Sequence, residues 1–127
     1  MALDLEYEKK KINLISEFKV ILDKRENISL EKSSPSNLYR IRNKPNDKKL
    51  DVKQFNKVIR IDADNLVAEV EGMIKYDDLV DETLKYDLMP TVVPELKPIT
   101  LGGAISGTGL ESSSFKFGFV HETIEKM

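Results

Sequence analysis

The segment ITLGGAISGTGLESSSFKFG, residues 99–118, constrains the fold of this chain more than any other stretch. It holds five of the six glycines and only two charged residues, Glu111 and Lys116, although 33% of the chain is charged. Glycine lets the backbone adopt positive φ angles and approach another group closely. The segment therefore predicts either a ligand cradle or a tight connection packed against another element, and glycine content alone supports both equally.

Peptide N–H groups and hydroxyls are the functional groups that this segment offers. Successive amides can converge on a phosphate without a positive side chain. The candidate amide donors are Gly102, Gly103, Ala104, Gly107 and Thr108, and the candidate hydroxyls are Thr100, Ser106, Thr108, Ser112, Ser113 and Ser114. A Walker-type loop ends in Gly-Lys-Ser/Thr and a dinucleotide fingerprint has a third glycine, and both features are absent. On chemistry alone, the segment indicates a phosphate or nucleotide cradle of another type.

Size and charge exclude several classes of protein. At 127 residues the chain has the length of one domain. Its 20 basic and 22 acidic residues argue against nucleic acid as a partner, because nucleic-acid binders concentrate positive charge. The chain has no cysteine, and its amino terminus, MALDLEYEKKK, lacks the regions of a signal peptide. No apolar run approaches the ~20 residues that cross a bilayer, so we expect a cytoplasmic protein.

Hydrophobic periodicity predicts two helices. The first covers residues 6–24, where five apolar residues share one stripe: Leu14, Ile15, Phe18, Ile21 and Leu22. The second covers residues 76–86, with Asp77 and Asp78 in its first turn and Pro90 after its end.

Short strands are predicted between and after these helices. One strand is expected at residues 28–31, and a hairpin at residues 57–71, where KVIRID and LVAEVE flank a short polar connection. TVVP, residues 91–94, predicts a brief buried strand, and KSSPSNLYRIRNKPNDKK, residues 32–49, predicts a loop or extended linker. Together these elements predict an α+β fold with a short mixed sheet flanked by helices. The residues expected to be buried together are Leu66, Ala68, Val70, Leu79, Val80 and Leu84.

Two adjoining sequences, VEGMIKYDDLVDETLKYDLMP and LMPTVVPELKPITLGGAISGTGLESSSFKFG, carry a resemblance to a known family. They resemble the amino-terminal part of the PCMH-type FAD-binding domain in FAD-linked oxidases of the vanillyl-alcohol oxidase type. The nearest branch is that of the Δ24-sterol reductases, with the pattern PELxxxTxGGxxxGTGxESSSxKxG. Because members are several times longer, the resemblance implies that residues 1–127 form one partial domain. It would comprise an amino-terminal helix and strand, residues 1–30, and an FAD-binding subdomain, residues 31–127, truncated at its carboxyl end.

The resemblance implies FAD as the cofactor, with its pyrophosphate and ribityl region wrapped by residues of the glycine-rich segment. These residues are Thr100, Leu101, Gly102, Gly103, Ala104, Ile105, Ser106, Gly107, Thr108, Gly109, Glu111, Ser112 and Ser113. The family's other phosphate loop corresponds to KSSPSNLYRIRNK, where the implied donors are Ser36, Asn37 and Arg40. By its own composition that stretch reads as a solvated basic linker. It has no histidine for covalent attachment, so the resemblance implies non-covalent FAD.

The resemblance also implies that this chain lacks part of the enzyme. Relatives continue with the rest of the flavin domain and a cap domain over the isoalloxazine ring, which would act here in cis or as another chain. We assign no catalytic residue and no metal ligand, and the lone His121 reads as structural. Residues after about Gly118 are expected to be poorly anchored, and an open sheet edge is expected to permit self-association.

Three functional hypotheses remain open from the sequence. The first is the FAD-binding portion of an FAD-linked oxidoreductase, which docks the pyrophosphate through the loop at residues 99–114; whether this chain is itself an enzyme stays undecided. The second is a non-catalytic remnant or interaction module that binds no flavin alone. The third is an unrelated phosphate-ligand protein that uses the same loop.

Overall fold

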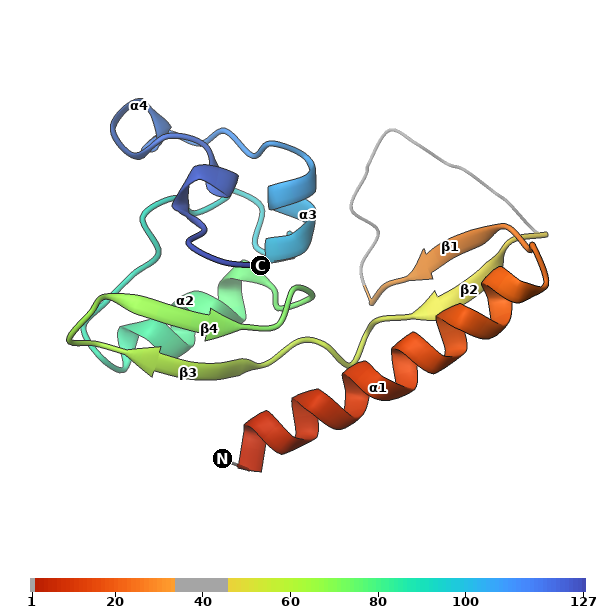
Figure 1. Ribbon diagram of the computed structural model, residues 1–127. Helices are drawn as coiled ribbons and strands as arrows, with labels where there is room; N and C mark the ends of the chain where they lie inside the picture. Colours follow the sequence, from red (N-terminus) through yellow and green to blue (C-terminus); the bar gives the residue numbers. More distant parts are fainter. Residues whose placement is uncertain (1, 34–45) are drawn as a thin grey trace. The chain divides into compact units, whose positions relative to one another are not determined.

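The structure is a computed structural model that describes residues 2–33 and 46–127 (Figure 1). The chain divides into two compact units, Met1–Phe55 and Asn56–Met127, each of which is described by itself. Helices and short paired strands occur in the chain, which confirms the α+β class. Among the residues described, no helix combines the length and the apolar character needed to span a bilayer.

The first unit consists of helix α1 (Ala2–Asp23) and the parallel strand pair β1 (Ile28–Glu31) and β2 (Lys48–Asp51). The pairing runs from Ile28 opposite Lys48 to Glu31 opposite Asp51. The predicted first helix and the strand at residues 28–31 are therefore confirmed. The prediction of a linker through residue 49 is wrong at its end, because Lys48 and Lys49 belong to β2.

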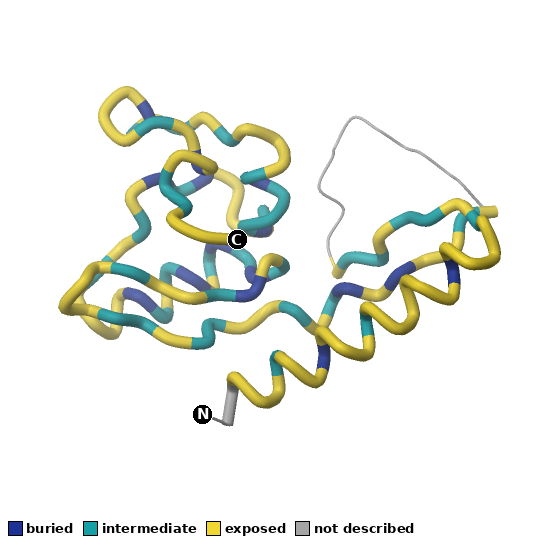
Figure 2. Tube along the Cα trace, viewed as in Figure 1, coloured by how far each residue is buried: buried dark blue, intermediate teal, exposed yellow. Residues whose placement is uncertain are grey.

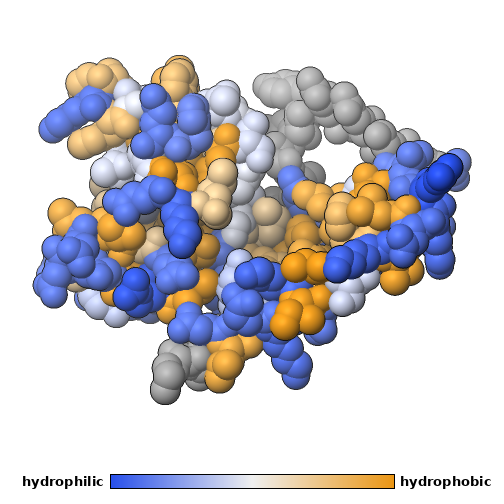
Figure 3. All heavy atoms as spheres, viewed as in Figure 1, coloured by the Kyte–Doolittle hydropathy of each residue, from blue (hydrophilic) through white to orange (hydrophobic). Residues whose placement is uncertain are grey.

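The buried face of α1 differs from the predicted stripe. Lys10 and Ile21 are buried, whereas Ile15, Phe18 and Leu22 are exposed. Figure 2 shows α1 as exposed along most of its length, and Figure 3 shows hydrophobic residues among charged ones on its surface. A two-stranded sheet offers only a narrow apolar surface, here Leu50 next to Val52, so it covers only part of the stripe.

Lys10 and Phe55 hold the amino-terminal half of α1. The Lys10 ammonium donates to the Gln54 carbonyl at 3.0 Å and lies 5.4 Å from the centre of the Phe55 ring. Tyr7 meets the same ring edge to face, with 6.3 Å between the ring centres. A lysine thus occupies a buried position because its charged end reaches a carbonyl and an aromatic face.

The second unit begins with the predicted hairpin, formed by strand β3 (Val58–Asp62) and strand β4 (Val67–Val70). Its turn is closed by the Asp62 carboxylate, which accepts from the backbone N–H and the side-chain amide of Asn65 at 3.1 and 3.0 Å. Leu66 then takes a positive φ of 58° and is 73% exposed, and Ala68 is exposed too. The predicted burial of these two residues is wrong. Leu66 belongs to the turn and not to β4, so the residues of β4 that face inward are Val67 and Val70 rather than Ala68.

Helix α2 (Tyr76–Leu84) follows the hairpin and contacts β3. It ends two residues before the predicted boundary because Asp87 adopts a left-handed φ of 57° and the Leu88 amide donates to the Thr83 carbonyl. Leu79 is buried as predicted. Leu84, in the last turn of the helix, is 52% exposed, so its predicted burial is wrong.

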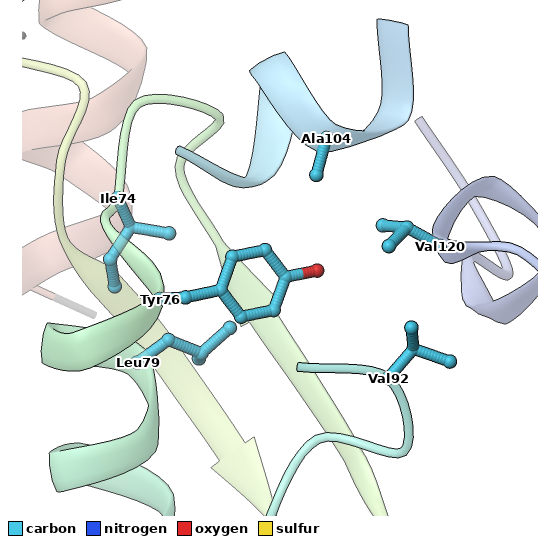
Figure 4. Packing of buried hydrophobic residues seen from close by; sticks show 6 residues of the cluster. All are labelled: Ile74, Tyr76, Leu79, Val92, Ala104 and Val120. Carbon is cyan, nitrogen blue, oxygen red and sulfur yellow. The ribbon is translucent and has the colours of Figure 1, made fainter. Parts of the chain in front are cut away.

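The rest of the unit consists of α3 (Leu101–Ser106), α4 (Ser114–Phe117) and the 3₁₀ helix η1 (Val120–Thr123). The core cluster, shown in Figure 4, joins α2 and the segment just before it to the α2–α3 connection, α3 and η1: Ile74, Tyr76, Leu79, Val92, Ala104 and Val120. Val92, within the predicted strand TVVP, is buried without forming a strand. The expected poor anchoring after Gly118 is wrong for Val120, which is fully buried and donates its amide to the Gly109 carbonyl at 3.0 Å.

Val120→Ala should lower the free energy of unfolding by about 2 kcal/mol, because two buried carbons are lost and a cavity remains. Phe115→Ala is the matched control, since Phe115 is 91% exposed and should change stability by less than ~0.5 kcal/mol. Urea denaturation followed by circular dichroism measures both. Equal midpoints for Val120→Ala and the unchanged chain would show that the carboxyl-terminal segment is not part of the core.

Candidate functional site

The glycine-rich segment starts by pairing with the beginning of α2. Lys75 and Thr100 form an antiparallel bridge, the Tyr76 amide donates to Ile99, and the Leu101 amide donates to Ile74 at 2.9 Å. Thr100 is buried, and its hydroxyl oxygen accepts from the Gly103 amide at 3.2 Å as the N-cap of α3. Thr100 and Leu101 therefore fix α3 to the core.

Gly102 is the point of closest approach between two backbones. Its amide donates to the Gly72 carbonyl at 2.7 Å, and a Cβ atom built on Gly102 would lie 2.8 Å from that oxygen. Likewise, a Cβ on Gly109 would lie 3.0 Å from a Val120 methyl. These glycines are thus required by contacts within the chain.

The five amides that the sequence singled out as phosphate donors all donate within the chain. Gly102 donates to Gly72, Gly103 to Thr100, Ala104 to Thr100, Gly107 to Gly103, and Thr108 to Ile105. Thr108 has a left-handed φ of 50°, and the next amide, on Gly109, donates back to Ala104 at 2.8 Å. Residues 100–109 therefore form a short helix whose amides donate to acceptors within the chain. The bond from Gly109 to Ala104 ends the helix and turns the chain away from its axis.

Unpaired donors follow immediately after this turn. The amides of Leu110, Ser112 and Ser113 have no acceptor among the described residues. The Ser112 hydroxyl also has no hydrogen-bond partner among them. Leu110 is 66% exposed, Ser112 is exposed and Ser113 is half-buried. Neutral donors in this arrangement suit an anionic or strongly polar ligand. We refer to residues 110–113 as the donor loop.

Side-chain bonds hold the donor loop against the connection between α2 and α3. The Ser113 hydroxyl donates to the Thr91 carbonyl at 2.8 Å, and the Glu111 amide donates to the Ser114 hydroxyl at 3.0 Å. The Glu111 carboxylate accepts from the Glu95 amide at 3.3 Å. The loop is thereby ordered in advance, which reduces the entropy lost when a ligand binds.

Tyr76, which is buried in the core cluster, carries a polar group that the sequence reasoning did not single out. Burial, with a contribution from the negative charge of Glu111, raises the pKa of its phenol to about 12. It stood in the predicted helical stripe of α2, so no signal in the sequence separated it from an ordinary core residue. The Leu110 amide was missed as well, because leucine carries no polar side chain.

The remaining candidates are placed as follows. Ile105 packs at the edge of the core, and the Ser106 hydroxyl donates to the Gly102 carbonyl at 2.8 Å. Ser36, Asn37 and Arg40 lie outside the described residues. The His121 ring stacks on Phe119, with 5.6 Å between the ring centres, while Glu122 accepts from the Phe119 amide. Within the described parts of the chain, no group of three acidic or histidine side chains is arranged to hold a metal ion.

The fold and the site define an α+β protein that presents free amides and a hydroxyl on an ordered surface loop. Comparison with known proteins then identifies the family: the FAD binding domain family matches residues 33–127, and the chain belongs to it. This match confirms the resemblance seen in the sequence. No solved structure shows a significant match.

Similar curated proteins are Δ24-sterol reductases. The protein from Pisum sativum is 33% identical over 75 residues, which cover 59% of this chain and 13% of that protein. The protein from Arabidopsis thaliana is 32% identical over 76 residues, covering 60% and 14%, and that from Homo sapiens is 33% identical over 61 residues, covering 48% and 12%. The chain therefore matches only about one eighth of the length of these relatives.

Gly102→Ala should destabilise the fold by about 1–3 kcal/mol, because the new methyl group would press on the Gly72 carbonyl. Gly72→Ala is the matched control on the other side of the same contact. A Cβ there meets no atom within 4 Å, so the variant should be neutral or gain up to ~1 kcal/mol from a stiffer unfolded chain. Thermal unfolding compares the two. An unchanged stability for Gly102→Ala would contradict the close backbone contact.

Proposed function

We propose that this chain binds FAD non-covalently and is the part of an FAD-linked oxidoreductase that docks the cofactor's pyrophosphate. The glycine- and serine-rich loop at residues 99–114 does this, with the donor loop as its contact surface. The observation that carries the proposal is that the amides of Leu110, Ser112 and Ser113 and the Ser112 hydroxyl have no hydrogen-bond partner in the described parts of the chain. Family membership supplies FAD as the ligand for those donors.

The available donors fit a pyrophosphate. Its oxygens accept hydrogen bonds from amides and hydroxyls, and bonds of this kind to a charged acceptor are stronger than neutral ones. Residues 100–109 act as the support, since the amides of Leu101 and Gly102 bond to residues before α2 and those of Gly107, Thr108 and Gly109 close the end of α3. Glu111 is the only acidic residue in residues 99–118, and its carboxylate is bonded to the Glu95 amide.

Non-covalent binding is supported by the composition of the chain. The stretch at residues 32–44, which corresponds to the family's other phosphate loop, has no histidine for covalent attachment, the chain has no cysteine, and its single histidine lies elsewhere. That histidine, His121, stacks on Phe119 in the segment of η1 and is not part of the donor loop.

When bound, FAD supplies a ring system that exchanges a hydride with a substrate. This chain's residues would bind and orient the nucleotide end of the cofactor. The similar proteins are named Δ24-sterol reductases, and the chain matches about one eighth of their length. We therefore place the groups that meet the substrate in the remainder of the flavin domain and a cap domain, supplied in cis or by another chain.

Open strand edges offer the surface on which such a remainder, or a second copy of this chain, would pair. In the described part of the chain, each of the two sheets has only two strands, so every strand has one unpaired edge. Unpaired edges present free N–H and C=O groups that favour strand addition.

A second function is favoured by a separate observation. The amides of Gly102, Gly103 and Ala104 are all engaged within the chain, as expected if the glycines serve packing alone. On this account the chain is an interaction module that binds no flavin by itself.

Titration of the chain with FAD, followed by quenching of flavin fluorescence, separates the two functions. We expect saturable binding, and Ser112→Ala should weaken it by about one to two decades, because a hydrogen bond to a charged group contributes roughly 1.5–3 kcal/mol. Ser16→Ala, on the exposed surface of α1, should leave the affinity unchanged. A chain that is folded but takes up no FAD would favour the interaction module.

A further inference from the structure

Helix α1 carries an apolar stripe on the side that does not pack on β2. Its packed side is marked by Lys10 and Ile21, which are buried. Four other apolar side chains are between 44% and 73% exposed: Leu5, Ile12, Ile15 and Leu22. At about 100° of rotation per residue, these four fall within roughly 100° of one another and nearly opposite the buried pair. A continuous exposed apolar stripe of this kind indicates a surface that binds another molecule.

This stripe has the spacing of a coiled-coil seam. Helices that pair side by side bury residues that alternate three and four positions apart. In α1 that spacing selects six exposed residues, to which we refer as the α1 seam: Leu5, Glu8, Ile12, Ile15, Lys19 and Leu22. Four of them are apolar, and the other two carry opposite charges. The 22 residues of α1 make a helix about 33 Å long, which accommodates about three heptads.

The order of residues in the α1 seam is self-complementary. When two copies of α1 are laid antiparallel about the middle of the seam, Leu5 of one copy meets Leu22 of the other. By the same symmetry Ile12 meets Ile15, and Glu8 meets Lys19. A twofold axis repeats each of these contacts, because residue i meets residue j and residue j meets residue i. All six positions on each helix therefore have a matching partner.

The two charges in the α1 seam favour the antiparallel orientation over the parallel one. In a parallel pair each position meets its own copy, so Glu8 would face Glu8 and Lys19 would face Lys19. Like charges there repel, whereas the antiparallel pair sets each carboxylate against an ammonium group. Within its own helix, Glu8 accepts from the Lys11 ammonium at 3.1 Å. Such an exposed ion pair contributes little free energy and does not prevent a second contact.

We propose that α1 is a self-association surface, on which a second copy of this chain packs antiparallel through the α1 seam. Burial of the apolar positions drives the association, and the pairs of Glu8 with Lys19 fix its register. A shift of one heptad in either direction would set a charge against an isoleucine, Lys19 against Ile15 or Glu8 against Ile12. The surface is separate from the donor loop and from the open strand edges, so the dimer does not depend on FAD.

Sedimentation velocity of the full chain over a range of concentrations tests this surface. We expect a reversible equilibrium between monomer and dimer. Ile12→Glu removes two buried isoleucines per dimer and should weaken association by at least about a hundredfold. Val20→Glu is the matched control, because Val20 is 53% exposed on α1 but lies outside the seam, and it should leave association unchanged. Circular dichroism checks that both variants are folded. A chain that stays monomeric, or a dimer that Ile12→Glu leaves intact, would overturn the proposal.

Charge reversals test the antiparallel orientation. Glu8→Lys and Lys19→Glu each bring like charges together twice in the dimer, and each should weaken association about tenfold. The double variant restores opposite charges at both places and should recover the original affinity to within about twofold. Glu17→Lys makes the same change of charge as Glu8→Lys on the far side of α1, where Glu17 is exposed, and should have no effect. A double variant that associates as weakly as the single variants would contradict the antiparallel pairing.

Discussion

Gly102 donates its amide to the Gly72 carbonyl across 2.7 Å, and the space between the two backbones is too small for a Cβ atom. This contact brings the start of α3 onto the connection between β4 and α2. Because the two backbones lie this close, Lys75 and Thr100 can form their bridge, and the Thr100 hydroxyl can accept from the Gly103 amide at the start of α3. Ala104 enters the core because α3 is held at this distance, and Val120 packs on the same side.

The same internal bonding determines where a ligand can be bound. The hydrogen bonds that secure α3 and the turn after it use the amides of this stretch, and the first amides after Gly109 without an acceptor among the described residues are those of Leu110, Ser112 and Ser113. The glycines and the donors of this segment thus have separate roles. Glycines allow the packing, and the following residues supply the polar groups. Charge contributes little, because Lys116 is the only basic residue in the segment.

Local patterns predicted much of the fold. The two helices, the strand at residues 28–31 and the hairpin carry periodicity or turn chemistry within a few neighbouring residues. Strand β2 could not be predicted, because KKLD has one buried side chain and depends on a partner twenty residues earlier in sequence. Leu66 and Leu84 were misjudged because a side-chain-closed turn and a left-handed helix end decide their exposure.

The segment that holds the candidate site could be predicted from the sequence, but the individual N–H and O–H groups that are free to bind a ligand could not. Residue types identified residues 99–114 as rich in amides and hydroxyls, but only the bonding pattern tells which of these groups are engaged. An NMR titration of the amide resonances with FAD tests the central claim most directly. We predict that the largest shifts fall on Leu110, Ser112 and Ser113, with small shifts at Gly102, Gly103 and Ala104. Shifts centred on Gly102 and Gly103, or none at all on the donor loop, would contradict the account.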